Sequence, residues 1–184
     1  MRIIAFAGSL RKNSYNKALL NAARVLAPKD CEIEILDLEG IPSYNQDLET
    51  EPPGKVKELK AKVKAADAVL IATPEYNYSV PGVLKNAIDW ASRPKGDNSF
   101  DGKPAAVLGA STGVLGTARA QYHLRQACVA LNMRLLNRPE VMVASAGEKI
   151  TAAGEVTDGK TRDLVGRLVA ELVKEARRQR TTSS

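Results

Sequence analysis

Short apolar runs alternate with amphipathic stretches along this 184-residue chain, and this alternation limits the possible folds more than any other feature. Residues 3–7, 68–72 and 105–108 are continuously apolar, as strands are when both faces of a parallel sheet are covered. A partly apolar run at 33–36 and a short apolar run at 141–143 bring the set of expected strands to five. Because parallel strands need crossover helices between them, the pattern predicts an α/β three-layer sandwich around one five-stranded parallel sheet.

The stretches between these strands carry apolar residues at helical spacing. Right-handed crossovers through such helices are compatible with the sheet order 2-1-3-4-5. In that order the chain reverses direction between the first and third strands, and the loops that diverge there leave a crevice in which ligands bind. Helices are expected over about residues 14–26, 56–63, 81–90, 117–131 and 164–173, with an irregular excursion over 144–159.

Composition and charge exclude several other kinds of function. The net charge of +6 comes from basic residues spread over several segments, and the one local cluster, 177–180, is typical of a helix end rather than an RNA site. The single histidine, His123, and the separated Cys31 and Cys128 offer no metal-ligand cluster, and we expect both thiols to be buried and reduced. Neither a membrane span nor a signal peptide is evident, so we expect a cytoplasmic protein with no membrane or nucleic-acid partner.

The first candidate segment is GSLRKNSYN, residues 8–16, which follows the first strand. Gly8 allows a sharp turn, the hydroxyls of Ser9 and Ser14 add hydrogen-bond donors, and the next helix begins with free N–H groups. Arg11 supplies a planar cation suited to a phosphate. The segment is neither a Walker A loop nor a dinucleotide fingerprint. It is also compatible with an ordinary polar turn in which Ser14 caps a helix.

The second candidate segment, TPEYNYSVPG at residues 73–82, follows the third strand. Pro74 stiffens the turn, and Glu75, Tyr76 and Asn77 offer backbone donors and an aromatic face. Such a loop suits a flat heterocycle, although it is also what a turn before a proline-initiated helix looks like.

The third candidate segment, GASTGVLGT at residues 109–117, pairs hydroxyls with glycines after the fourth strand. Its small residues permit a close approach of the backbone to a ligand, and the alternative is a plain glycine-rich turn. All three segments lie at carboxyl ends of expected parallel strands, so together they predict one mononucleotide site.

The chain resembles the NADPH-dependent FMN reductase family, which includes quinone, azo-dye and chromate reductases. The resemblance is carried by GSLRKNSYNKAL, PEYNYSVPGVLKNAIDWASRP and FDGKPAAVLGASTG, and it spans nearly the whole domain. It implies one flavodoxin-like, FMN-binding domain over residues 1–178, and residues 179–184, which match no pattern, are expected to form a disordered tail.

The resemblance also implies roles for single residues. The first loop would hold the FMN phosphate, the second would hold the isoalloxazine, and part of the third would lie near the ring or the ribityl chain. No catalytic side chain is implied, because the flavin supplies the reactivity. The predicted cofactor-binding residues are Ser9, Leu10, Arg11, Ser14, Tyr15, Asn16, Pro74, Glu75, Tyr76, Asn77, Ser111 and Gly113.

The activity implied is hydride transfer from NADPH or NADH to the N5 atom of bound FMN, followed by electron delivery to quinones, azo dyes, chromate or free flavins. The alternatives are a flavodoxin-type electron carrier and a non-catalytic flavin-binding module. Flavodoxins tend to be acidic and to use a Thr-rich phosphate loop, whereas this chain is basic and uses Ser-x-Arg.

Members of the family are commonly homodimers or homotetramers, so an oligomer is implied here as well. The long loop at 41–49 is expected to shape the mouth of the site and the subunit contact, unless it is an ordinary surface loop. Tyr76 and Trp90 are candidates for that contact, with packing inside the subunit as the alternative for Trp90.

Overall fold

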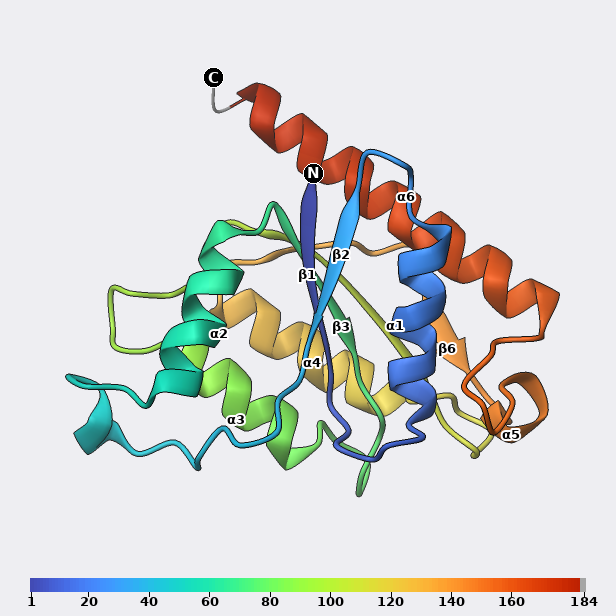
Figure 1. Cartoon of the computed structure of the whole chain (residues 1–184), viewed down its shortest axis with the longest axis horizontal. Coiled ribbons are helices and arrows are strands. Elements are labelled where there is room, and N and C mark those ends of the chain that lie inside the picture. Colours follow the sequence, from blue (N-terminus) through green and yellow to red (C-terminus); the bar gives the residue numbers. More distant parts are fainter. Residues whose placement is uncertain (183–184) are drawn as a thin grey trace.

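A computed structural model describes residues 1–182 as one six-stranded parallel sheet with helices on both faces (Figure 1). The elements in chain order are β1 (Arg2–Ala7), α1 (Tyr15–Leu26), β2 (Glu32–Leu36), the 3₁₀ turn η1 (Gln46–Leu48), α2 (Gly54–Ala65), β3 (Ala68–Ala72), α3 (Gly82–Ala91), β4 (Pro104–Ala110), α4 (Ala118–Ala130), β5 (Arg134–Leu135), β6 (Val141–Val143), α5 (Ala146–Lys149) and α6 (Gly159–Thr182).

The strand order is β2-β1-β3-β4-β5, which confirms the flavodoxin-like arrangement predicted from the sequence. Strands β1 and β3 pair in parallel register, with Ile3 opposite Ala68 and Ala7 opposite Ala72. Their carboxyl ends therefore lie side by side, and the Gly8 N–H donates to Ala72 O over 2.8 Å just beyond the sheet. The loops after β1 and β3 leave the sheet at this point, as the strand order requires.

Alternate residues along each strand build two separate cores. Ile3 and Ala5 of β1 face α1 and α6, whereas Ile4 and Phe6 face α2, α3 and α4. Figure 1 shows the same division, with α1 and α6 on one side of the sheet and α2 and α3 on the other. All four of these strand residues are completely buried, so β1 has no solvent face, as its apolar run predicted.

The fifth position of the sheet is divided between two short strands. Strand β5 pairs with the start of β4 through Leu135, and β6 pairs with its end through Val141. Between them the chain leaves the ladder around Pro139, which has no N–H to donate. The sequence predicted β6 but not β5, because two residues are too few for a recognisable apolar run.

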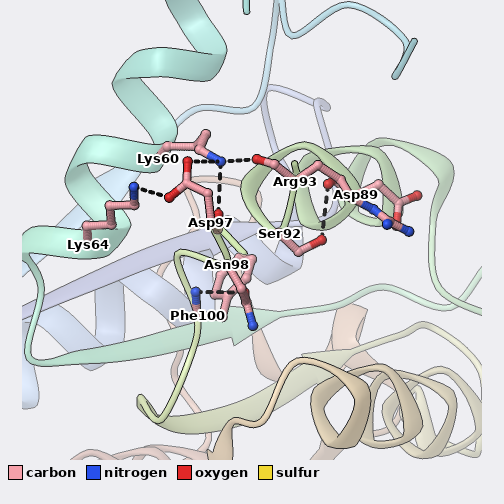
Figure 2. Close-up of polar contacts among 8 residues, drawn as sticks. All are labelled: Lys60, Lys64, Asp89, Ser92, Arg93, Asp97, Asn98 and Phe100. Atoms are coloured by element: carbon pink, nitrogen blue, oxygen red, sulfur yellow. Dashed lines mark hydrogen bonds and ion pairs between the residues drawn. The ribbon is translucent and has the colours of Figure 1, made fainter. Parts of the chain in front are cut away.

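A buried lysine ties α2 to the connection between α3 and β4 (Figure 2). The ammonium group of Lys60 donates to the backbone oxygens of Arg93 and Asp97 and lies 3.0 Å from the Asp97 carboxylate. Lys64 binds the other oxygen of that carboxylate. The hydrogen bonds from Lys64 and Lys60 hold the pKa of Asp97 below its ordinary value. Because this connection leads from a helix into a strand, it lies at the amino ends of the strands, away from the switch point.

The long final helix extends further than predicted. Gln179 donates from its side chain to Gly102 O over 2.8 Å, and Arg180 donates from Nε to the Asp67 carboxylate over 3.0 Å. These contacts hold the last turns of α6 against the sheet, and the helix includes residues 179–182, which were expected from the sequence to form a tail. Residues 183 and 184 lie outside the described residues.

Two further segments differ from their predictions. Residues 144–159 include the short helix α5 and a bridge between Ile150 and Val156, both of which are buried, so the segment is more ordered than an irregular excursion. Trp90 is buried and donates from Nε1 to Pro42 O over 2.8 Å, which places it inside the subunit. No helix within residues 1–182 is long and apolar enough to cross a membrane.

Candidate functional site

A cavity of about 180 Å³ opens where β1, β3 and β4 end, and we call it the switch-point cavity. The three loops predicted from the sequence all contribute to it. Its lining consists of Ser9, Arg11, Ser14, Tyr15 and Asn16 from the first loop, Pro74, Glu75 and Tyr76 from the second, and Ala110, Ser111 and Thr112 from the third.

Three predicted residues do not line this cavity. Leu10 is exposed at the surface beside it. Asn77 lies at the tip of the second loop, and Gly113 donates its N–H to Ser111 Oγ over 3.1 Å. Conversely, the residue-by-residue prediction omitted Ala110 and Thr112, although both belong to the third segment that the sequence singled out.

The first loop contains unused backbone donors, and two of the residues that carry them, Ser14 and Tyr15, line the cavity. Ser14 caps α1, since its Oγ accepts from the N–H groups of Asn16 and Lys17 over 3.2 and 3.4 Å. Within residues 1–182 the N–H groups of residues 12–15 have no protein acceptor. Orphan donors at the start of a helix, beside Ser9 and Arg11, form the arrangement that binds phosphate groups in other proteins.

Gly8 lets the first and second loops come together. A Cβ atom at this position would lie 3.1 Å from both Leu84 Cβ and Pro74 Cδ, closer than nearly all real contacts. A larger residue here would therefore require Leu84 and Pro74 to shift by a few tenths of an ångström.

The side chain of Asn16 is committed to the protein. Its Nδ2 donates to Ala110 O and its Oδ1 accepts from Ala110 N, both over 3.0 Å, and the residue is buried. Asn16 thus ties the first loop to the end of β4. The amide is occupied with the backbone, so its contribution to the cavity is one of position.

Glu75 has a structural partner that the sequence did not indicate. Its carboxylate accepts from the N–H groups of Arg119 and Ala120 over 3.0 and 3.2 Å, and it forms an ion pair with the Arg119 side chain. Thr117, at the N-cap of α4, makes no capping bond through its side chain. Glu75 therefore caps α4 from the neighbouring loop and neutralises its own charge there.

The second loop forms a tight hairpin. Tyr76 and Ser79 exchange two backbone hydrogen bonds of 3.1 and 3.0 Å, while Asn77 and Tyr78 adopt left-handed φ values of 50° and 66°. The Arg119 guanidinium lies 3.5 Å from the centre of the Tyr78 ring and covers it. The Tyr76 N–H, expected from the sequence to face a ligand, is used within this hairpin, whereas the Glu75 N–H has no protein acceptor within residues 1–182.

The third loop depends on two glycines that admit no side chain. A Cβ atom on Gly109 would lie 2.1 Å from Thr117 Oγ1 and 2.4 Å from Thr73 O. Gly116 has a φ of +54°, and a Cβ atom there would lie 2.6 Å from the Met142 backbone. These contacts bring the Ser111 segment close to the ends of β3 and β6.

The remaining reactive side chains lie outside the cavity. His123 is exposed on α4 and meets Ser79 Oγ through Nδ1 over 3.0 Å. Burial raises the pKa of the Cys128 thiol to about 11. Cys31 is half-buried rather than fully buried as expected. Among residues 1–182 no group of His, Cys, Asp and Glu is arranged to hold a metal ion.

A parallel sheet of order 2-1-3-4-5, with three loops that meet in one cavity at its switch point, defines a flavodoxin-like class of protein. Comparison with known sequences identifies the family within this class. Residues 1–148 match the NADPH-dependent FMN reductase family, and the chain belongs to this family.

Named relatives are similar over nearly their whole length. An NAD(P)H-dependent FMN reductase of Pseudomonas aeruginosa is 52% identical over 166 residues, which cover 90% of this chain and 89% of the relative. A quinone reductase of Escherichia coli is 43% identical over 175 residues, covering 92% and 93%. The structure of FerB, a flavoenzyme NAD(P)H:(acceptor) oxidoreductase from Paracoccus denitrificans, is similar with a TM-score of 0.88 and 41% identity, covering 96% and 97%.

Proposed function

We propose that this protein is an NAD(P)H-dependent oxidoreductase that holds FMN in the switch-point cavity and passes electrons to quinones and other small acceptors. The observation that carries the proposal is the pair of unused N–H donors at Ser14 and Tyr15, which line the cavity together with Ser9 and Arg11 at the switch point of a flavodoxin-like sheet. FMN reductase and quinone reductase relatives, at 43–52% identity over most of the chain, support the same activity.

The residues of the first loop fit the FMN phosphate. Ser9 and Ser14 are buried and keep their hydroxyl protons free to donate, because the bonds found for both Oγ atoms are ones in which they accept. Arg11 uses one Nη2 proton on Asn13 O and keeps its other donors. We assign the phosphate to these groups and to the free N–H groups beside them, with Asn16 as the residue that positions the loop.

The second and third loops fit the flavin ring and the ribityl chain. Pro74 and Tyr76 offer apolar and aromatic surface, and the Glu75 N–H is a free donor on the same side of the cavity. Ser111 and Thr112 of the third loop also line the cavity and carry hydroxyl groups. When bound, FMN would accept a hydride from NAD(P)H and return two electrons to the acceptor. The chain's part is to orient the ring and to leave one face open.

An open ring face is supported by the exposure of the second loop. Tyr76, which lines the cavity, is 51% exposed, so within residues 1–182 this side chain is left half open to solvent. A small acceptor and a nicotinamide can therefore use the same face in turn. We assign no side chain to proton transfer, because the Glu75 carboxylate is occupied with α4.

We also propose that the chain forms a homo-oligomer through the surface around α4. Val114 and Val129 are 84% and 79% exposed, and Leu115 and Tyr122, on α4 or in the loop before it, are exposed as well, so this part of the surface offers apolar side chains for a contact. Light scattering coupled to size-exclusion chromatography tests the assembly. A Val129→Glu variant is expected to shift it toward the monomer, and an unchanged mass would place the contact elsewhere.

Anaerobic mixing of the FMN-loaded protein with NADPH or NADH tests the activity. Rapid bleaching of the flavin absorbance is expected, followed by reoxidation when a quinone is added. A flavin that stays oxidised with both nucleotides would instead favour an electron carrier or a binding module. Steady-state rates with quinone, chromate, azo-dye and free-flavin acceptors at one NADPH concentration then rank the acceptors, and quinone turnover far below chromate turnover would contradict the preference for quinones.

A further inference from the structure

A second cavity, of about 270 Å³, shares Arg11, Ser14 and Tyr15 with the switch-point cavity. It lies between the first turns of α1 and a turn at residues 151–154, so we call it the α1-turn cavity. The turn is closed by a hydrogen bond of 2.9 Å from Gly154 N to Thr151 O, and the bridge between Ile150 and Val156 fixes its base. The cavity therefore has one wall in common with the proposed FMN phosphate site and a second, ordered wall of its own.

The α1-turn cavity differs from the other cavities in its charge. Arg11 and Lys12 contribute two cations, and within the described chain no carboxylate is among its lining residues. The cavity between β2 and α2 and the groove beside β6 also contain cations, but each contains acidic side chains as well. Those acidic side chains are Glu34, Asp37 and Glu58 in the first case and Glu140 and Glu171 in the second.

The two cations differ in how far they are already held by protein groups. Arg11 is held to Asn13 O over 3.0 Å, and its guanidinium lies 5.8 Å from the centre of the Tyr15 ring, on the wall between the two cavities. Lys12 is exposed and has no acidic partner within residues 1–182. Ser14 Oγ satisfies only the N–H groups of Asn16 and Lys17, so the free N–H donors at the start of α1 add to the positive charge of these side chains.

We propose that the α1-turn cavity binds the 2′-phosphate on the adenosine half of NADPH, with Lys12 as its principal cation, so that Lys12 favours NADPH over NADH. This inference rests on the proposed function, which places the nicotinamide against a flavin ring beside Pro74 and Tyr76. Those two residues line only the switch-point cavity, whereas Arg11 lines both cavities. A dinucleotide that covers the ring and extends along the shared wall brings its adenosine half to the second cavity. NADH has no phosphate to offer there.

The test uses the FMN-loaded protein and two probes that cannot reduce it, adenosine 2′,5′-bisphosphate and adenosine 5′-monophosphate. They differ only in the 2′-phosphate. Titration calorimetry is expected to show at least about tenfold tighter binding of the bisphosphate, the scale of one charge-assisted hydrogen bond. Lys12→Ala is expected to remove that advantage, and Lys12→Glu to reverse it. Lys29→Ala, an exposed lysine just after the far end of α1, is the matched control and is expected to leave both affinities unchanged.

Equal affinity for the two probes in the unmodified protein, no measurable binding of either, or an unchanged preference in Lys12→Ala would each overturn the assignment. Stopped-flow reduction separates this failure from that of the proposed function. With the inference correct, Lys12→Ala raises the apparent Kd for NADPH about tenfold relative to that for NADH, whereas Lys29→Ala leaves both values and the limiting rate of flavin bleaching unchanged. If neither nucleotide bleaches FMN although the bisphosphate binds through Lys12, the proposed function fails and the phosphate subsite stands.

Discussion

Asn16 and Ala110 exchange two hydrogen bonds of 3.0 Å across 94 positions of sequence, and both lie in the buried floor of the switch-point cavity. The Asn16 side-chain amide bonds both the N–H and the C=O of Ala110, which a neighbouring strand would otherwise do at the end of β4. The start of α1 and the third loop are thereby fixed to each other before any ligand binds.

Asn16→Leu is expected to destabilise the protein by about 2–3 kcal/mol, because it leaves the buried N–H and C=O of Ala110 without partners. FMN affinity is expected to fall with it, since the loops would lose their common anchor. Urea unfolding and quenching of FMN fluorescence measure the two effects. Gln126→Ala, on the exposed face of α4, is the control, and equal stability of the two variants would contradict the anchoring role.

Gly109→Ala tests the close contact beneath the third loop. The new methyl group would meet Thr117 Oγ1 at 2.1 Å and Thr73 O at 2.4 Å, and only movement of backbone can relieve the second contact. A loss of about 1–3 kcal/mol in unfolding free energy is expected, together with weaker FMN binding. Gly82→Ala, where nothing lies within 4 Å of the added atom, should be neutral or slightly stabilising in the same thermal unfolding assay.

The contact between Asp67 and Arg180 predicts a dependence of stability on acid pH. Burial raises the pKa of Asp67, but hydrogen bonds from the Arg2 N–H and the Arg180 side chain outweigh it, and the net pKa is lowered. The resulting stability is fully present above the unfolded pKa of about 3.9 and is lost as the pH falls through the folded pKa. Asp67→Asn should therefore be less stable than the parent at pH 7, and denaturant titrations should show this gap narrowing toward about pH 2. A gap that stays constant would argue against the linkage.

Lys60→Met tests the tie between α2 and the connection before β4. Removing the buried ammonium leaves the carbonyl oxygens of Arg93 and Asp97 without their donor, so a loss of about 1–3 kcal/mol is expected. Lys57→Met breaks only an exposed pair with Glu51, and a change of about 0–1 kcal/mol is expected. Because both positions lie away from the switch point, kcat/KM with NADPH and a quinone should be unaltered in either variant. A large fall in kcat/KM for Lys60→Met alone would show that the connection communicates with the site.

The arrangement of the sheet could be predicted from the sequence because most of its strands are short apolar runs that can be recognised without knowing the fold. The apolar runs at 68–72 and 141–143 coincide with β3 and β6, and the strand order follows from the alternation with helices. The positions of the three loops then follow from the rule that ligands bind at carboxyl ends of parallel strands. For that reason most of the predicted residues meet in one cavity.

What the sequence could not supply are partners that are distant along the chain. Nothing around Glu75 indicates that its carboxylate caps α4, 44 positions away, and nothing around Asn16 indicates Ala110. The helical structure of residues 179–182 likewise involves a contact between Arg180 and Asp67, which are far apart in sequence. The polar sequence at this end gives no sign of that contact. Local pattern identifies a segment, whereas side-chain assignments within it depend on tertiary contacts.

The capping of α4 by Glu75 has a consequence for the way molecules reach the cavity. With that carboxylate neutralised by Arg119 and by the helix end, the charge that an incoming anion meets at the mouth comes from Arg11 and its neighbour Lys12. Attraction of this kind acts over a Debye length of about 10 Å at 0.1 M salt. The association rate constant for a nucleotide should therefore fall as ionic strength rises. The rate of the chemical step after binding should stay the same.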